Sequence, residues 1–209
     1  MFTGIVTAIG TVLSAEERGD LRVRIACPFD PAGIAVGASI ACSGVCLTVV
    51  ERGGTAGDAW FAVDVSAETV RHTADQWRKG ARLNLEPALK LGDELGGHIV
   101  TGHVDAVGKV AGVEAAGGST KLTIAAPPAL APFIAPKGSI TVDGVSLTVN
   151  AVADQPDGAA HFTLNIIPHT GDVTTLGGLR EGSGVNLEID VLARYLRRMQ
   201  VVGGSASGA

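Results

Sequence analysis

The sequence predicts an all-β protein made of two tandem copies of a small six-stranded barrel, followed by a C-terminal α-helix. Three observations support this fold class. Several segments recur in the same order roughly 100 residues apart, which indicates a duplicated domain. Within each copy, apolar and polar residues alternate with the period of two that half-buried strands show. The 29 glycines and the frequent turn signals fit the corners and bulges of a closed barrel.

The repeat defines the domain organisation. The copies separate between Pro87 and Gly97, and we expect domains over residues 1–97 and 98–189, a helix over 190–202 and a disordered tail over 203–209. The matching segments are 3–12 with 101–110, 39–49 with 139–149, and 84–86 with 186–188.

About six short strands are expected in each copy, separated by glycine-rich or proline-containing turns. In the first copy they are predicted at residues 5–12, 21–25, 39–40, 46–51, 60–65 and 82–86. In the second they are predicted at residues 121–124, 139–141, 146–151, 161–166 and 184–189, and residues 101–110 repeat the alternating segment 3–12.

A few short stretches have helical character. Residues 66–70 and 168–172 are predicted as matched helical turns, and residues 30–33 and 127–130 as matched helix starts. After Asp190, an apolar stripe at helical spacing predicts an amphipathic helix. This stripe packs either against its own domain or against the same helix of other subunits. We favour the second alternative, which predicts an oligomer. The stripe consists of Val191, Leu192, Tyr195, Leu196 and Met199.

Composition excludes several classes of function. With 46% hydrophobic and 18% charged residues, the chain is globular, and its net charge of −5 argues against a nucleic-acid partner. No apolar run approaches the roughly 18 residues of a membrane span, so no membrane partner is expected. Three cysteines, an odd number, favour a reducing compartment, and we expect a cytoplasmic protein.

Motifs for metals, nucleotides and activated serines are missing from the sequence. Cys42 and Cys46 lack the further ligands of a zinc site, and His98 and His103 are expected to point to opposite faces of a strand. Neither a nucleophile elbow nor a glycine-rich phosphate loop is found. We therefore predict no metal and no cofactor.

Polar residues in the repeated strand form the most informative pattern. Cys46 and Thr48 share one face of their strand, as do Ser146 and Thr148 in the second copy. Satisfied hydroxyl groups in a barrel would give the same pattern. However, the copies differ chemically, because Ser146 replaces Cys46, Asp143 replaces Ser43 and His103 replaces Ile5. Unequal polar groups on a paired scaffold suggest two similar pockets with different roles.

The segments that carry these residues resemble the riboflavin synthase family of the lumazine-binding superfamily. The resemblance rests on residues 1–6 (MFTGIV), 96–105 (GGHIVTGHVD) and 143–149 (DGVSLTV), and it extends to about Met199. It implies two Greek-key barrels and a homotrimer assembled by the C-terminal helices. An association with lumazine synthase is left open.

The resemblance also implies a reaction. Two molecules of 6,7-dimethyl-8-ribityllumazine would be converted, by transfer of a four-carbon unit and without a cofactor, into riboflavin and 5-amino-6-(D-ribitylamino)uracil. The active site would lie between the first barrel of one subunit and the second barrel of its neighbour. Lumazine proteins of luminous bacteria share the fold but only bind the chromophore, and they lose polar residues of the second pocket. Because this chain keeps polar residues in both pockets, an enzyme is favoured over such a binding protein.

Site residues follow from the same resemblance. The catalytic candidates are His103, Ser146, Cys46 and Asp190, with proton transfer or orientation expected of His103. First-domain ligand contacts would be Phe2, Gly4, Ile5, Val6, Cys46, Leu47, Thr48, Asp64, Val65, Ser66, Ala67, Glu68 and Thr69. Second-domain contacts would be Gly102, His103, Val104, Ser146, Leu147, Thr148, Asn165, Ile166, Ile167, Pro168, His169 and Thr170, with Lys137 reaching a neighbouring subunit's ligand.

Overall fold

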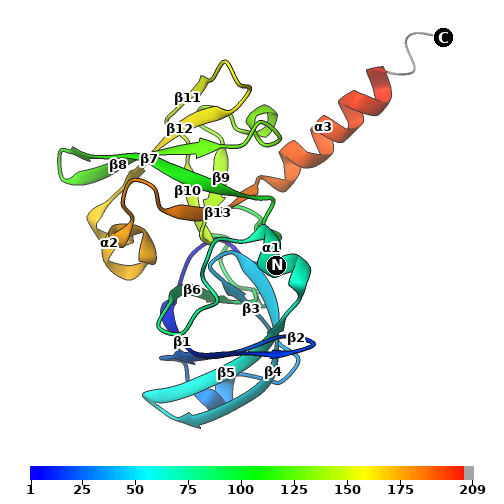
Figure 1. The fold of residues 1–209 in the computed structure, drawn as a ribbon, viewed down its shortest axis with the longest axis vertical. Coiled ribbons are helices and arrows are strands. Elements are labelled where there is room, and N and C mark those ends of the chain that lie inside the picture. The colour runs from blue at the N-terminus through cyan, green and yellow to red at the C-terminus, as the bar shows by residue number, and fades with distance from the viewer. Residues whose placement is uncertain (205–209) are drawn as a thin grey trace.

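A computed structural model describes residues 1–204 of the chain. Two β-domains lie one above the other in Figure 1, and the C-terminal helix extends away from both of them. The first domain is coloured blue to cyan and the second green to orange. The predicted all-β duplicated fold with a C-terminal helix is therefore confirmed.

The first domain is a closed barrel of six strands. Its order is β1-β2-β5-β4-β3-β6, in which β2 lies beside β5 rather than beside β3. The last strand, β6, lies beside β3, the first of the three consecutive hairpin strands β3, β4 and β5, and this is the Greek-key arrangement. The strands are β1 (Ala8–Arg18), β2 (Asp20–Cys27), β3 (Ser39–Cys42), β4 (Val45–Thr55), β5 (Asp58–Val65) and β6 (Arg82–Pro87).

The second domain repeats this strand order but contains seven strands instead of the predicted six, and they form a curled sheet rather than the predicted closed barrel. Its order is β10-β9-β13-β7-β8-β12-β11, and the two edge strands are consecutive in the chain. In the first domain, β4 passes this point with a shift of register between Val49 and Glu51. In the second, Asn150 replaces Val50 and the strand divides into two, which is consistent with the low β-propensity of asparagine. The strands are β7 (Ala106–Ala116), β8 (Ser119–Ala126), β9 (Ser139–Val142), β10 (Val145–Thr148), β11 (Ala151–Asp154), β12 (Ala160–Ile166) and β13 (Gly184–Ile189).

The first strand of each domain begins later than predicted. Residues 5–7 and 102–105 alternate like strand residues, but they precede β1 and β7 and run toward the other domain. Alternation of apolar and polar residues indicates a segment with one buried and one exposed face. A segment that crosses between two domains also has one buried and one exposed face, so its sequence looks like that of a strand.

Short helices connect several strands, and one long helix follows the last strand. The matched helical turns are found as α1 (Ala67–His72) and α2 (Pro168–Val173), while η1 (Pro31–Gly33) fits the first predicted start. Its counterpart η2 (Ala131–Phe133) begins later than predicted, because residues 127–130 form a turn in which Leu130 N–H bonds Pro127 O at 2.9 Å. A further turn, η3, spans Thr175–Gly178.

The C-terminal helix α3 spans Val191–Gly204, two residues beyond the predicted helix end at 202. The rest of the expected tail, residues 205–209, lies outside the described residues. None of the helices within residues 1–204 combines the length and apolarity that a membrane crossing requires.

Each domain has its own apolar core, and a small third cluster lies between them. Inward-facing residues such as Val23, Ile25 and Phe61 fill the first barrel, and Ile124, Phe162 and Leu187 fill the second domain. Phe2 packs with Ala41 and Val100 in the third cluster. The packing of this third cluster therefore fixes the facing ends of the two domains relative to each other.

Candidate functional sites

The segments that lead into the two domains cross over to each other's barrels. Gly4 O accepts a hydrogen bond from Ser146 N–H at 2.8 Å, and Gly102 O accepts the equivalent bond from Cys46 N–H at 2.8 Å. Val6 packs against the second core and Val104 against the first. The predicted grouping is therefore corrected, because the segment with His103 lies beside Cys46, whereas Gly4 lies beside Ser146.

Glycine is required at both crossing points, by which we mean the contact of Gly102 with Cys46 (the first) and the contact of Gly4 with Ser146 (the second). Gly4 and Gly102 have φ values of 75° and 76°, which residues with a Cβ adopt only with strain. A Cβ on Gly4 would lie 2.5 Å from Ser146 Cβ, and one on Gly102 would lie 2.6 Å from Cys46 Cβ. The backbone of each leading segment thus contacts the strand that carries the polar candidate.

A buried carboxylate at the end of each domain's last strand fixes the segment. Glu188 accepts bonds from Thr101 N–H at 2.6 Å, from Thr101 Oγ1 at 2.7 Å, and from the N–H groups of Gly102 and His103 at 2.9 and 3.0 Å. Glu86 accepts equivalent bonds from Thr3 and Gly4 at 2.7 to 3.0 Å. Burial raises the pKa of both carboxyls, although these bonds oppose the rise.

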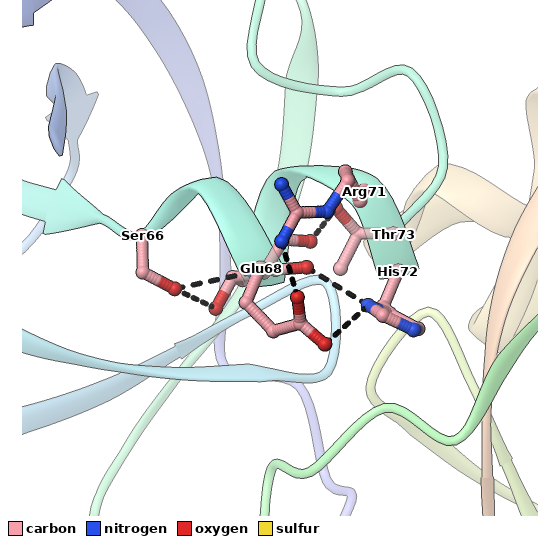
Figure 2. A network of polar contacts seen from close by, with 6 residues as sticks. Ser66, Glu68, Arg71, His72 and Thr73 are labelled. Atoms are coloured by element: carbon pink, nitrogen blue, oxygen red, sulfur yellow. Dashed lines mark hydrogen bonds and ion pairs between the residues drawn. The ribbon is translucent and has the colours of Figure 1, made fainter.

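The first crossing point opens into a pocket of about 350 Å³. The leading segment of the second domain, residues 102–104, and strand β4 form one wall of the pocket. Helix α1 forms the other wall, and Figure 2 shows the polar network of this helix. Ser66 caps α1 by accepting a bond from Thr69 N–H at 3.2 Å. The pocket combines apolar, thiol, carboxylate and imidazole groups, and its lining residues are Val45, Cys46, Glu68, Thr69, His72, Thr73, Gly102, His103 and Val104.

Ser146 at the second crossing point belongs to a hydrogen-bonded chain of side chains. His98 Nδ1 lies 2.7 Å from Ser146 Oγ, and His98 Nε2 lies 3.3 Å from Thr141 Oγ1. Burial lowers the pKa of His98, while the charge of Asp190 opposes this effect. A neutral imidazole has one donor and one acceptor nitrogen, so the tautomer of His98 decides whether its Nδ1 donates to the Ser146 hydroxyl or accepts from it.

Some predicted contact residues have side chains that reach neither the first pocket nor the contact between Ser146 and His98. Leu47, Val65 and Ile166 belong to the barrel cores, with Leu147 packed against the second core, and Phe2 is 1% exposed. A ligand could contact them only through their backbone. This outcome agrees with the predicted alternation, in which Leu47 and Leu147 point away from the polar face.

The remaining predicted residues lie around the two crossing points or on the exposed rims. Asp64 bonds Arg22 Nε at 2.5 Å, and this contact lowers the pKa of the Asp64 carboxyl. Asp190 begins α3 and accepts a bond from Leu192 N–H at 2.9 Å. Ile5 is exposed and follows Gly4 at the second crossing point. The residues left exposed or half-buried, without a contact to either crossing point among the bonds above, are Thr48, Ala67, Thr148, Asn165, Ile167, Pro168, His169 and Thr170.

Lys137 lies on the exposed loop before β9 and has an unusual backbone. Its φ is 67°, one of three positive values among the non-glycine residues that the structure describes, and its first-domain counterpart is Gly37. Strain of this kind often marks a functional position.

Two histidines of these sites were not among the predicted site residues. His98 was weighed only as a metal ligand, and its contact with Ser146 joins positions 48 residues apart in the sequence. His72 lines the first pocket, and its spacing of four from Glu68 on a helix was the signal that could have revealed it.

Fold and geometry together define a class of protein, namely a duplicated β-domain protein with two equivalent crossing points of unequal chemistry. The family model for the lumazine binding domain matches the chain twice, over residues 3–88 and 101–190. Riboflavin synthase from Brucella abortus (strain 2308) is 47% identical over 204 residues, which cover 95% of this chain and 98% of that protein. Riboflavin synthase from Mycobacterium tuberculosis (strain ATCC 25618 / H37Rv) is 44% identical over 207 residues, covering 98% and 100% of the two chains.

Solved structures agree with the sequence relatives. The crystal structure of LumP complexed with riboflavin matches with a TM-score of 0.74 and 26% identity, covering 90% of this chain and 99% of that chain. LumP complexed with 6,7-dimethyl-8-(1'-D-ribityl) lumazine matches with a TM-score of 0.73 and 25% identity over the same shares. The chain therefore belongs to the riboflavin synthase family of lumazine-binding proteins. It is an enzyme, a transferase of riboflavin biosynthesis.

Proposed function

We propose that this chain converts two molecules of 6,7-dimethyl-8-ribityllumazine into riboflavin and 5-amino-6-(D-ribitylamino)uracil. This proposal rests on the duplicated crossing point. Equivalent backbone contacts at the two places, the first and second frames, are surrounded by different side chains. Cys46 and His103 occupy the first frame, and Ser146 and Ile5 the second. Two like frames suit two like molecules, and unequal side chains suit a donor and an acceptor of the four-carbon unit.

The reaction requires the two lumazines to be held against each other. Orienting two reactants in this way removes much of the entropic barrier of a bimolecular step. The first site of one subunit and the second site of its neighbour together provide such an arrangement, with Lys137 reaching the ligand of the adjacent subunit. The strained backbone of Lys137 supports a functional role for this loop.

The C-terminal helix supports assembly into a homotrimer. Four of its apolar side chains are between 62% and 70% exposed in the single chain, whereas Arg194 forms an ion pair with Asp105 at 2.8 Å. An exposed apolar helix face of this length gains stability by packing against copies of itself. The exposed residues are Leu192, Tyr195, Leu196 and Met199.

Proton transfer begins the chemistry, because the C7 methyl group of one lumazine must lose a proton. A base that titrates near neutral pH is suited to this step. His103 in the first pocket is one candidate base. His98 is a positioning residue for Ser146, whose hydroxyl would bond the ring or assist addition to it.

The decisive experiment incubates the purified chain with 6,7-dimethyl-8-ribityllumazine alone and follows riboflavin by absorbance and fluorescence. One riboflavin for every two lumazines consumed is expected. Ser146→Ala and His103→Ala should each reduce turnover about 100-fold while a lumazine still binds. Binding without any product would instead make the chain a lumazine-binding protein, and no binding would remove both functions.

Assembly is tested separately by ending the chain at Asp190. This variant should be a monomer by light scattering and should lose most of its turnover. A monomer with full activity would refute a site built from two subunits.

A further inference from the structure

His72 is a titratable residue of the first pocket without a role in the proposed reaction. It is the last residue of α1 and lines the cavity together with Cys46 and His103. Its side chain is 56% exposed, so it contacts both the pocket and the solvent. Figure 2 shows its ring at the end of the helix, next to Glu68.

Glu68 holds the imidazole of His72 in a defined orientation. His72 Nδ1 lies 3.0 Å from the backbone oxygen of Glu68 and 3.3 Å from its Oε1. Both neighbours are acceptors, so the hydrogen of a neutral ring lies on Nδ1 and the lone pair on Nε2. Nε2 is then available to accept a proton.

The carboxylate of Glu68 is itself fixed by a second partner. Arg71 donates a hydrogen bond to Glu68 Oε2 at 2.5 Å, and this bond, together with the charge of His72, lowers the pKa of the Glu68 carboxyl. A carboxylate that remains ionised at neutral pH can stabilise a positive charge formed on the neighbouring imidazole.

The end of α1 is attached to the barrel rather than free. Thr73 Oγ1 donates to Thr69 O at 2.8 Å and accepts a bond from Trp77 Nε1 at 2.9 Å. Trp77 is buried in the first core. His72 therefore has a fixed position relative to the opposite wall of the pocket.

The second domain lacks this pair. On α2, Val173 occupies the position of His72, and His169 occupies that of Glu68. The first copy thus presents Glu68 and His72 four residues apart on its helical wall, in contact with each other and lining the pocket with Cys46 and His103. Helix α2 carries its imidazole and its acid at other positions, as His169 and Asp172.

We propose that His72, oriented by Glu68, is the residue that carries protons between the first pocket and the solvent during turnover. This inference rests on the proposed function. The two lumazines and the two products contain the same atoms, so every proton withdrawn from a lumazine must return to a product. Nε2 of His72 accepts the proton that leaves the pocket, the imidazolium beside Glu68 releases it to water, and the reverse path returns a proton later. The titratable and charged groups around His72 are Glu68 on α1, which contacts it, and Cys46 on β4 and His103, which line the same pocket; Arg71 on α1 pairs with Glu68.

The test measures steady-state conversion of 6,7-dimethyl-8-ribityllumazine by His72→Ala and His72→Gln. Both changes should lower kcat about 10- to 100-fold and leave KM within about twofold, because proton transfer is lost while binding remains. Added imidazole should restore turnover of His72→Ala, since the side chain is open to solvent. Val70→Ala, which alters the same helix at a residue that does not line the pocket, serves as the matched control and should stay within about twofold of wild type.

The outcomes separate this inference from the proposed function. A wild-type chain that makes no riboflavin would refute the proposed function itself. With an active wild type, unchanged kcat in His72→Gln would overturn the role of His72 alone. A reduced kcat in His72→Ala that imidazole does not restore would also overturn it, because a structural defect predicts that result.

Discussion

Asp143 is a carboxyl group buried where the hairpins of the two domains meet. Its Oδ1 accepts a bond from Asn186 N–H at 2.8 Å, and in the first domain Ser43 Oγ accepts the equivalent bond from Asn84 N–H at 3.1 Å. Burial raises the pKa of Asp143 from 3.8 to about 7. The same structural position is thus filled by a titrating group in one copy and by a neutral hydroxyl in the other.

This pKa shift makes the stability of the protein depend on pH. Below about pH 4, Asp143 is neutral in both the folded and the unfolded chain, so its favourable contribution is fully present. Between about pH 4 and pH 7, the unfolded chain loses the proton that the folded chain retains, and stability falls as pH rises. A shift of about three units corresponds to roughly 4 kcal/mol, lost by the time the pH exceeds 7.

Asp143→Ser copies into the second domain the residue that the first domain uses. We expect the variant and the wild type to have similar unfolding free energies at pH 4. At pH 8 we expect the variant to be more stable by about 2–4 kcal/mol, because it buries no charge. The measurement is urea unfolding of both proteins at intervals from pH 4 to pH 8.5. Ser43→Asp is the converse control, and its stability should fall more steeply with pH than that of the wild type. Parallel stability curves for Asp143→Ser and wild type would refute the reasoning.

Two further predictions concern the crossing points. Gly102→Ala should destabilise the chain by about 2–4 kcal/mol, because the added Cβ meets Cys46, whereas Gly80→Ala, at a positive φ in open space, should lose only about 1 kcal/mol; equal losses in urea unfolding would show that contact with Cys46 is unimportant. His98→Ala should reduce riboflavin formation about 100-fold with little change in lumazine affinity, since it removes the partner of Ser146; a turnover rate equal to wild type would contradict a role for this contact.

Much of the fold could be predicted from local patterns. The repeat, the alternation of residues such as Leu21 to Ile25 and the position of the C-terminal helix all depend on neighbours in sequence. The division of the strand at Asn150 could not be predicted in this way, because the first domain passes the equivalent point with a bulge.

The residues of the sites were easier to predict than which of them lie together in one site. A repeat indicates that Gly4 and Gly102 are equivalent, but not that each lies against the other domain. That arrangement depends on hydrogen bonds that join Gly4 to Ser146 and Gly102 to Cys46. The same limit applies to His98, whose partner is distant in sequence.

The reciprocal crossing has an evolutionary consequence. In a dimer of identical domains, both crossing segments would carry the same side chain, so a change that improved one site would be imposed on the other. Joining the domains in one chain removes this constraint, and Ile5 and His103 now differ at equivalent places. At the same time each domain depends on the other, because the leading segment of each contacts the strand that carries the polar candidate of the other. One gene thus encodes two sites that are free to diverge in chemistry but must be inherited, folded and retained together.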